Sequence, residues 1–187
     1  MCVDSPLTPT YIWRMTSESV VDTRSTDITG DLFRAVMGSV CTPVSVVTAF
    51  DSARPHGTTV SAFCSLSLNP PLVLVALDEG SALLQVLRTS ARFGLNVLSQ
   101  GQGGVAGQFA TKGDDKFGDV AWEARSEVPH IIDSACWFAC DVEQLVPGGD
   151  HTIVIGRVVE TDHVDLPPLT YHRRGFGTHA TLNQQTA

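Results

Sequence analysis

Charged residues are scarce in this chain, and lysine is almost absent. Charged residues make up 17% of the 187 residues, below the roughly 25% that is typical of soluble domains. The two lysines are Lys112 and Lys116, and 20 acidic residues outnumber 12 basic ones to give a net charge of −8. An acidic chain repels phosphate backbones and anionic lipids, so we expect neither a nucleic-acid nor a membrane partner. The low charged fraction predicts that part of the surface is covered, most simply by a second copy of the chain.

Long apolar runs are also missing. The longest, Pro70 to Leu77, has eight residues, whereas a membrane-spanning helix needs about 20. The first 20 residues lack the basic segment and apolar core of a secretory signal, so we expect a soluble, cytoplasmic protein. The length predicts one domain, which we place at residues 27–178 between an N-terminal arm (1–26) and a C-terminal tail (179–187).

Several common functional signatures are absent. No G-x-G-x-x-G follows an expected strand, and the chain has neither a phosphate-binding P-loop nor a G-x-S-x-G elbow. The five cysteines have irregular spacing. Cys136 and Cys140, the closest pair, would lie ~13 Å apart in a strand, too far for a disulfide. They predict buried thiols in a reducing compartment, and without zinc-type spacing of Cys and His we expect no metal.

What the sequence does contain is a series of short β-type segments separated by turns. With about seven strands and two or three short helices, the pattern favours a mainly β fold, an antiparallel barrel with helical additions, over a parallel doubly wound sheet. The expected helices are a first one capped by Asp27 and running through Val40, then Ala82–Thr89 capped by Ser81, and Gln102–Ala110. The expected strands are Val44–Phe50, an extended run from His56 to Leu68, Leu72–Leu77, Arg92–Leu98, the hairpin Ala135–Val146 with His151–His163, and Leu169–Arg173.

Small hydroxyl residues are concentrated between His56 and Ser67. In a continuous strand, Thr59, Ser61, Ser65 and Ser67 would share one face, along which a flat heteroaromatic ring could lie. The alternative is the polar solvent face of an ordinary strand.

Three further features have both a functional and a plain interpretation. Lys112 and Lys116 suit a phosphate, but both also suit a solvated loop neutralised by neighbouring aspartates. In Gly149-Asp150-His151 the aspartate could orient the imidazole or simply complete a turn. Tyr171 with the pair Arg173-Arg174 could meet a nicotinamide dinucleotide or decorate an edge strand.

The order of these features along the chain is informative. His56-Gly-Thr-Thr-Val-Ser-Ala-Phe63 leads into Ser65-Leu-Ser-Leu-Asn-Pro-Pro-Leu-Val73. Ala91-Arg-Phe-Gly-Leu-Asn-Val-Leu98, Gln108-Phe-Ala110, Lys116-Phe117 and Gly149-Asp-His151 then follow in this order. From Phe33 to about Phe176 the sequence resembles the short-chain flavin reductases, the reductase components of two-component flavin-dependent monooxygenases.

The resemblance implies an FMN-binding split barrel, an antiparallel Greek-key β-barrel, that forms a homodimer. It implies reduction of FAD or FMN by hydride transfer from NADH, in preference to NADPH, and delivery of the reduced flavin to a partner monooxygenase. The implied cofactor-binding residues are Pro55, His56, Gly57, Thr58, Thr59, Val60, Ser61, Ala62 and Ser67 beside the flavin ring, Ala76, Leu77, Asp78, Ser81 and Ala82 along the ribityl and phosphate side, Phe109, Ala110, Thr111 and Lys112 near the phosphate, and His151, Tyr171 and Arg173 on the nicotinamide side, with His151 as the catalytic candidate.

Two other readings remain open at this point. A non-catalytic flavin- or haem-binding protein on the same barrel would retain its ligand without oxidising a nicotinamide. A pyridoxal-phosphate oxidase on a related barrel would need more basic residues for its phosphate than this chain's two lysines offer.

Overall fold

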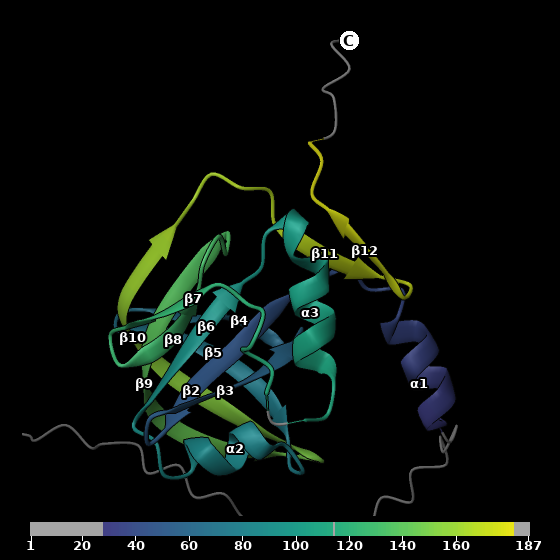
Figure 1. Cartoon of the computed structure of the whole chain (residues 1–187). Coiled ribbons are helices and arrows are strands. Elements are labelled where there is room, and N and C mark those ends of the chain that lie inside the picture. Colours follow the sequence, from purple (N-terminus) through teal and green to yellow (C-terminus); the bar gives the residue numbers. More distant parts are fainter. Residues whose placement is uncertain (1–27, 114, 182–187) are drawn as a thin grey trace, which may run out of the picture.

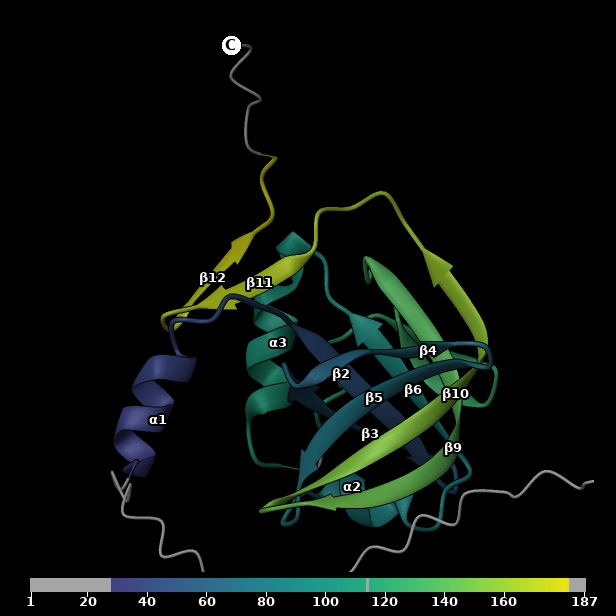
Figure 2. The same cartoon turned by 180° about the vertical axis from the view of Figure 1, so that it is seen from behind.

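The computed structural model describes residues 28–113 and 115–181. Figures 1 and 2 show a curved β-structure with helices around it. The elements in chain order are α1 (Gly30–Met37), β1 (Thr42–Pro43), β2 (Ser45–Asp51), β3 (Arg54–Val60), β4 (Phe63–Leu68), β5 (Pro71–Asp78), α2 (Ala82–Leu87), β6 (Arg92–Val97), the 3₁₀ turn η1 (Gln100–Gln102), α3 (Gly103–Ala110), β7 (Trp122–Arg125), β8 (Val128–Ile131), β9 (Cys136–Gly148), β10 (His151–His163), β11 (Leu169–His172) and β12 (Gly175–Thr178).

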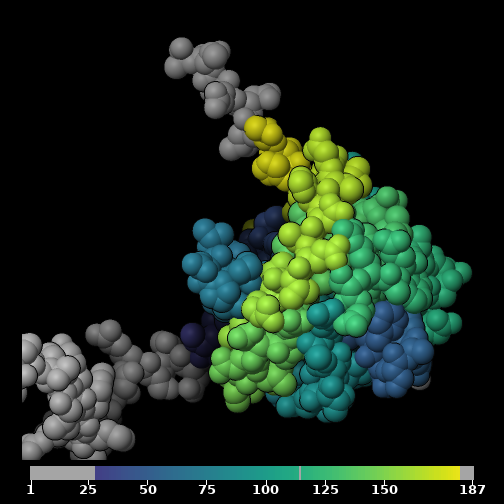
Figure 3. Space-filling view, turned by 90° about the vertical axis from the view of Figure 1, so that its left-hand side faces the viewer, coloured from purple at the N-terminus to yellow at the C-terminus, as the bar shows by residue number. Residues whose placement is uncertain are grey.

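The main sheet has seven strands in the order β3-β2-β6-β9-β10-β5-β4. Every neighbouring pair is antiparallel, which confirms the mainly β, antiparallel prediction. The predicted long hairpin is present as β9 and β10, joined at Gly149-Asp150. Figure 3 shows β10, in yellow-green, crossing one whole face of the molecule. The same strand begins at His151, so it carries that residue to the end of the sheet.

Strand β2 separates the two main cores of the protein. Along it, Val47 and Ala49 face a cluster with α2 and the inner faces of β5, β6 and β10, whereas Val44, just before β2, and Val46 face a second cluster under α3. Successive strand side chains point to opposite faces, and both faces of β2 are buried. This explains why β2 carries adjacent Val46 and Val47 instead of an alternation of apolar and polar residues.

The described helices differ in how closely they pack against the barrel. Figure 1 shows α2 closing one end of the barrel and α3 lying along its side. Ser81 is the N-cap of α2, as predicted. By contrast, α1 stands away from the barrel and is capped by the Thr29 side chain rather than by Asp27, which lies outside the described residues. Together with its flanking residues, α1 carries an apolar stripe whose side chains are between 46% and 69% exposed: Ile28, Leu32, Phe33, Val36, Met37 and Val40.

The expected extended run from His56 to Leu68 is wrong as a single strand. It is interrupted at Ser61-Ala62, because β3 pairs with β2 at one edge of the sheet and β4 pairs with β5 at the other. A register shift between Ser65 and Ser67 breaks β4 again. The hydroxyl groups therefore do not form one row. Four short strands, β1, β7, β8 and β12, were not predicted. The expected last strand ends at His172 and forms a hairpin with β12.

The described cysteines are all free thiols. Cys140 is buried, and burial raises the pKa of its thiol to about 12; Cys136 on the same strand is half-buried. Cys41 and Cys64 are exposed. Within the described residues, none of the helices combines the length and apolarity required to traverse a bilayer.

Candidate active site

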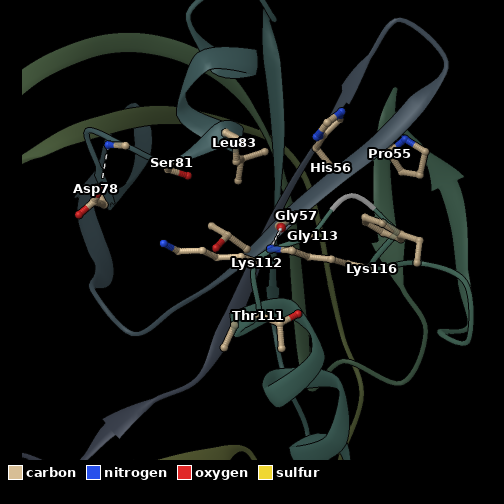
Figure 4. A pocket seen from close by; sticks show the side chains of 15 residues that line it. Pro55, His56, Gly57, Asp78, Ser81, Leu83, Thr111, Lys112, Gly113 and Lys116 are labelled. Carbon is tan, nitrogen blue, oxygen red and sulfur yellow. Dashed lines mark hydrogen bonds between the residues drawn. The ribbon is translucent and has the colours of Figure 1, made fainter.

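Two adjoining cavities, of about 620 Å³ and about 230 Å³, lie at one end of the main sheet. Thr58, Asp78 and Ser81 line both, and we call the two together the cleft. Their combined size suits a cofactor-sized ligand, since such pockets measure roughly 300–1,000 Å³. Figure 4 shows the larger cavity between β3, the turn from β5 to α2 and the loop that follows α3.

One side of the cleft, which we call the packed wall, consists of β3, the end of α3 and the loop around Lys116. Gly57 lies directly on the ring of Phe109, because a Cβ added at Gly57 would come within 2.6 Å of that ring. Phe109 meets Phe117 edge to face, with ring centroids 4.8 Å apart. The close packing explains why this position of β3 is a glycine.

The two lysines of the loop have different roles. The Nζ of Lys116 donates hydrogen bonds to the carbonyl oxygens of Gly57 (3.3 Å) and Phe109 (3.1 Å), and burial lowers the pKa of Lys116. Lys112, in contrast, has no hydrogen bond or ion pair within the described part of the chain and extends toward the side where Asp78 and Ser81 lie (Figure 4). Lys116 therefore holds the packed wall together, and Lys112 is available to a ligand.

The opposite side, which we call the hairpin wall, consists of the turn from β5 to α2 and the start of β10. His151 lies opposite Asp78 in the antiparallel ladder. The Asp78 carboxylate accepts a 2.7 Å hydrogen bond from the Gly80 amide. His151 Nδ1 donates to the Asp150 carboxylate at 2.7 Å, and this hydrogen bond lowers the pKa of Asp150. The aspartate thus bonds to the imidazole and also stands in the turn between β9 and β10, so the geometry of both sequence interpretations is present.

Polar groups without partners face or border the cleft. The Ser81 side chain makes no capping hydrogen bond to α2, and Nε2 of His56 is buried without a partner in the described structure. The Thr59 hydroxyl, however, donates to the Ala106 carbonyl at 2.7 Å, so it ties β3 to α3. Hydrogen-bonding capacity for a ligand is therefore present at His56, Ser81 and Lys112.

Most of the residues predicted from the sequence line the cleft. They are Pro55, His56, Gly57, Thr58, Thr59, Val60, Ser61, Ala62, Ala76, Leu77, Asp78, Ser81, Ala82, Ala110, Thr111, Lys112 and His151. Four do not. Phe109 is fully buried beneath Gly57, Ser67 lies on β4 opposite Leu72, and Tyr171 and Arg173 belong to the β11–β12 hairpin.

Arg173 lines a different groove, between that hairpin and α1. This groove, about 590 Å³ in volume, also contains Arg34, Arg174 and Ser39. Within one chain, therefore, neither Tyr171 nor Arg173 is among the residues that line the cleft with His151.

Five lining residues were missing from the prediction: Gly80, Leu83, Gly113, Lys116 and Phe117. Lys116 stands out in the sequence because it is one of only two lysines, and it was interpreted there as a candidate phosphate ligand. The structure gives it two carbonyl partners instead. In the described part of the chain, no three His, Cys, Asp or Glu side chains are grouped to hold a metal ion.

Comparison with known proteins identifies the family. Residues 37–180 match the family model of the flavin reductase like domain. This chain belongs to that family. The stretch includes all the residues that line the cleft, so the cleft is a feature of the flavin reductase-like domain.

Three curated relatives are similar over most of this chain. A "Probable flavin reductase" of Rhizobium meliloti (strain 1021) is 40% identical over 147 residues, which are 78% of this chain but 47% of that protein. The reductase component of the 4-nitrophenol 4-monooxygenase/4-nitrocatechol 2-monooxygenase of Rhodococcus opacus is 37% identical, covering 78% of each chain. The flavin reductase (NADH) of Kitasatospora aureofaciens is 40% identical, covering 80% of this chain and 81% of its own. The chain thus spans about half of the first relative and about four fifths of the other two.

Among solved structures, the NADH:FAD oxidoreductase SgcE6 of Streptomyces globisporus C-1027, in complex with NAD and FAD fragments, superposes with a TM-score of 0.76. It is 31% identical and covers 83% of this chain and 94% of its own. The split-barrel fold expected for a flavin reductase-like protein is confirmed.

Proposed function

We propose that this protein is an NADH-dependent flavin reductase that transfers a hydride from NADH to FAD or FMN and passes the reduced flavin to a separate monooxygenase. The observation that carries the proposal is the cleft, which gathers seventeen sequence-predicted residues in a chain of the flavin reductase-like family. Relatives named as an NADH flavin reductase and as a monooxygenase reductase component support the substrate and partner classes. Because NADH is an intracellular reductant, we propose a cytoplasmic location.

The residues of the cleft fit a flavin. Small side chains leave room for a flat ring, among them Ser61 and Ala62 between β3 and β4 and Ala76 on β5. The unpartnered Nε2 of His56 and the free Ser81 hydroxyl can hydrogen-bond to its polar atoms. Lys112 provides a positive charge for a phosphate, with Thr111 beside it.

This arrangement indicates what the two cofactors contribute to the reaction and what the chain contributes. Flavin and nicotinamide supply the hydride chemistry between their two rings. The packed wall holds one face of the site rigid, and the Lys112 ammonium group anchors a phosphate. His151, held by Asp150, lines the smaller cavity with Ala62 and Leu77 and orients the nicotinamide. No side chain needs to donate or accept a proton in the hydride step, so the contribution of the chain is positioning.

The function is tested by mixing the purified protein with NADH and FAD, FMN or riboflavin under nitrogen and following the absorbance of the oxidised flavin. We expect bleaching with NADH and slower bleaching with NADPH. Tight flavin binding without nicotinamide oxidation would instead establish the non-catalytic flavin-binding alternative, and the absence of both would contradict the proposal.

We further propose that the active species is a homodimer in which α1 packs on the second copy. An isolated helix shorter than about 12 residues is marginal in water, and α1 has eight residues with no buried side chain. Its exposed apolar stripe therefore requires a cover. Because Tyr171 and Arg173 lie on the β11–β12 hairpin, which is bonded to the end of α1 through Arg173 and Gly38, their predicted place near the nicotinamide requires that they reach the cleft of the other copy.

The homodimer is tested by charge placed on either face of α1. Leu32→Glu with Val36→Glu introduces charge into the apolar stripe, whereas Ala35→Glu introduces it beside Arg34 on the polar face. We expect the wild type and Ala35→Glu to elute near twice 20.0 kDa and the double variant near the monomer mass. Elution of the wild type as a monomer would contradict the proposal.

A further inference from the structure

Glu79 lies outside the cleft, yet its side chain and backbone join the two halves of the hairpin wall. The Thr152 hydroxyl donates a hydrogen bond to Oε1 of Glu79, and the Glu79 amide donates to the Asp150 carbonyl at 3.0 Å. Oε2 of the same carboxylate accepts a 2.9 Å hydrogen bond from Arg88 on the far side. A single residue thus connects the turn after β5 with both neighbours of His151.

The two oxygens of Glu79 have different environments. The residue bonded to Oε1, Thr152, is 4% exposed, whereas the side chains in the Arg88 ion pair are 42% and 48% exposed. A buried hydroxyl that loses its partner is costly, but an exposed ion pair contributes little. The contact with Thr152 is therefore the one that can fix geometry.

Thr152 and His151 point to opposite faces of β10, since successive strand residues alternate. Glu79 consequently acts behind the strand, while His151 faces the cleft. Neither Glu79 nor Thr152 is among the residues that line the cavities, so any influence on the reaction passes through the backbone of residues 150–152.

We propose that Glu79 is a positioning residue, which through Thr152 fixes the start of β10 so that His151 meets the nicotinamide. The inference rests on the proposed function, because it assigns His151 to the nicotinamide side of the site. The hydrogen bond from Thr152 to Oε1 should therefore affect the KM for NADH, whereas the ion pair between Oε2 and Arg88 should not.

The test compares variants that remove one contact at a time. Thr152→Val removes the hydroxyl with little change in shape, and Thr152→Ser keeps the hydroxyl. Glu79→Gln keeps an acceptor for Thr152 without the charge. Glu79→Ala removes the side-chain contacts with both Thr152 and Arg88. Arg88→Met is the matched control for Oε2. We expect Thr152→Val and Glu79→Ala to raise the KM for NADH about fivefold to tenfold. Thr152→Ser, Glu79→Gln and Arg88→Met should stay within about twofold, and every variant should keep the wild-type Kd for FMN.

Two results would overturn the inference. In the first, Thr152→Val and Glu79→Ala lower the melting temperature but leave the KM for NADH unchanged, which would make the contact purely structural. In the second, Arg88→Met and Glu79→Gln impair NADH use as strongly as Glu79→Ala, which would assign the effect to the ion pair.

Failure of the proposed function gives a different result, namely a wild type that oxidises no NADH. The positioning claim is then still tested by amide hydrogen exchange of residues 150–152, which we expect to accelerate in Glu79→Ala and Thr152→Val but not in Arg88→Met. Unchanged exchange in all three variants would contradict the inference whether or not the protein is a reductase.

Discussion

The two walls of the cleft are built by different forces. The packed wall depends on shape, with Gly57 on the ring of Phe109 and Lys116 bound to two backbone carbonyls. Apart from the buried Thr152, the hairpin wall depends on hydrogen bonds between exposed or half-buried polar groups, such as Asp150 with His151. A packing defect in the interior lowers the free energy of unfolding strongly because its neighbours cannot relax around it. The loss of an exposed polar contact changes that free energy little. Changes in the packed wall should therefore affect stability and flavin binding together, and changes in the hairpin wall should affect mainly the reaction.

The largest effect is expected from Gly57→Ala in the packed wall. The new methyl group would overlap the ring of Phe109, which is fully buried and also contacts Phe117. Overpacking of this kind costs about 1–3 kcal/mol. We expect a corresponding loss in the free energy of unfolding, measured by urea denaturation, together with weaker FMN binding.

The control for this substitution is the same chemical change on the neighbouring helix. A Cβ at Gly104 or Gly107 of α3 would meet nothing within 4 Å. Gly104→Ala and Gly107→Ala should be neutral or more stable by up to about 1 kcal/mol, because alanine favours the helix. If Gly57→Ala were as stable as these two variants, the packed wall would not be defined by shape.

A smaller effect on stability is expected from Lys116→Met. The substitution keeps the length of the side chain but removes both hydrogen bonds, to Gly57 and Phe109. A loss of about 1–2 kcal/mol in the free energy of unfolding follows. Flavin binding should weaken equally for FMN and riboflavin, because Lys116 holds the wall and not the phosphate. Selective loss of FMN would contradict this role.

Lys112→Met should weaken FMN binding selectively and leave stability nearly unchanged, in contrast to Lys116→Met. Lys112 is exposed and makes no bond within the described residues, so the free energy of unfolding should change by less than about 0.5 kcal/mol. We expect the Kd for FMN to rise about tenfold while that for riboflavin, which has no phosphate, stays unchanged. Both dissociation constants can be measured from quenching of flavin fluorescence. Equal weakening of FMN and riboflavin would remove Lys112 from the phosphate site.

The difference between the walls also explains what the sequence could predict. Local patterns were sufficient for the long hairpin and for α2 with its Ser81 cap, whereas most of the cleft-lining residues were implied by the family resemblance. Some family motifs, however, serve the fold and not the site. In the block from Arg92 to Leu98, the buried Asn96 donates to the Val46 carbonyl and the Thr48 hydroxyl and accepts from the Ile131 amide. Asn96 therefore joins β6, β2 and β8 and lies outside the cleft.

What the sequence could not show are contacts between distant segments. The break at Ser61-Ala62 arises because β3 and β4 belong to opposite edges of the sheet, which local alternation does not reveal. The partners of Lys116 are 59 and 7 residues away, and Phe109 is buried because it underlies Gly57. Likewise, periodicity indicates which face of a helix such as α1 needs to be covered, but it does not identify what covers that face.

The smallest expected effect concerns Asp150 in the hairpin wall, and it depends on pH. The hydrogen bond from His151 lowers the pKa of Asp150 below its usual 3.8. A carboxyl whose pKa is lower in the folded state adds stability above its unfolded pKa, and this stability is lost as the pH falls through the folded value. Because the side chain is 92% exposed, Asp150→Asn should lower the melting temperature by at most about 2 °C at pH ~5, and the difference should be smaller at a pH below the usual 3.8 of the carboxyl. Asp165→Asn, at an exposed aspartate without an ion pair in the described chain, is the matched control and should show no difference at either pH. A difference that is undiminished at the lower pH would mean that the Asp150–His151 contact does not contribute through the charge of the carboxylate.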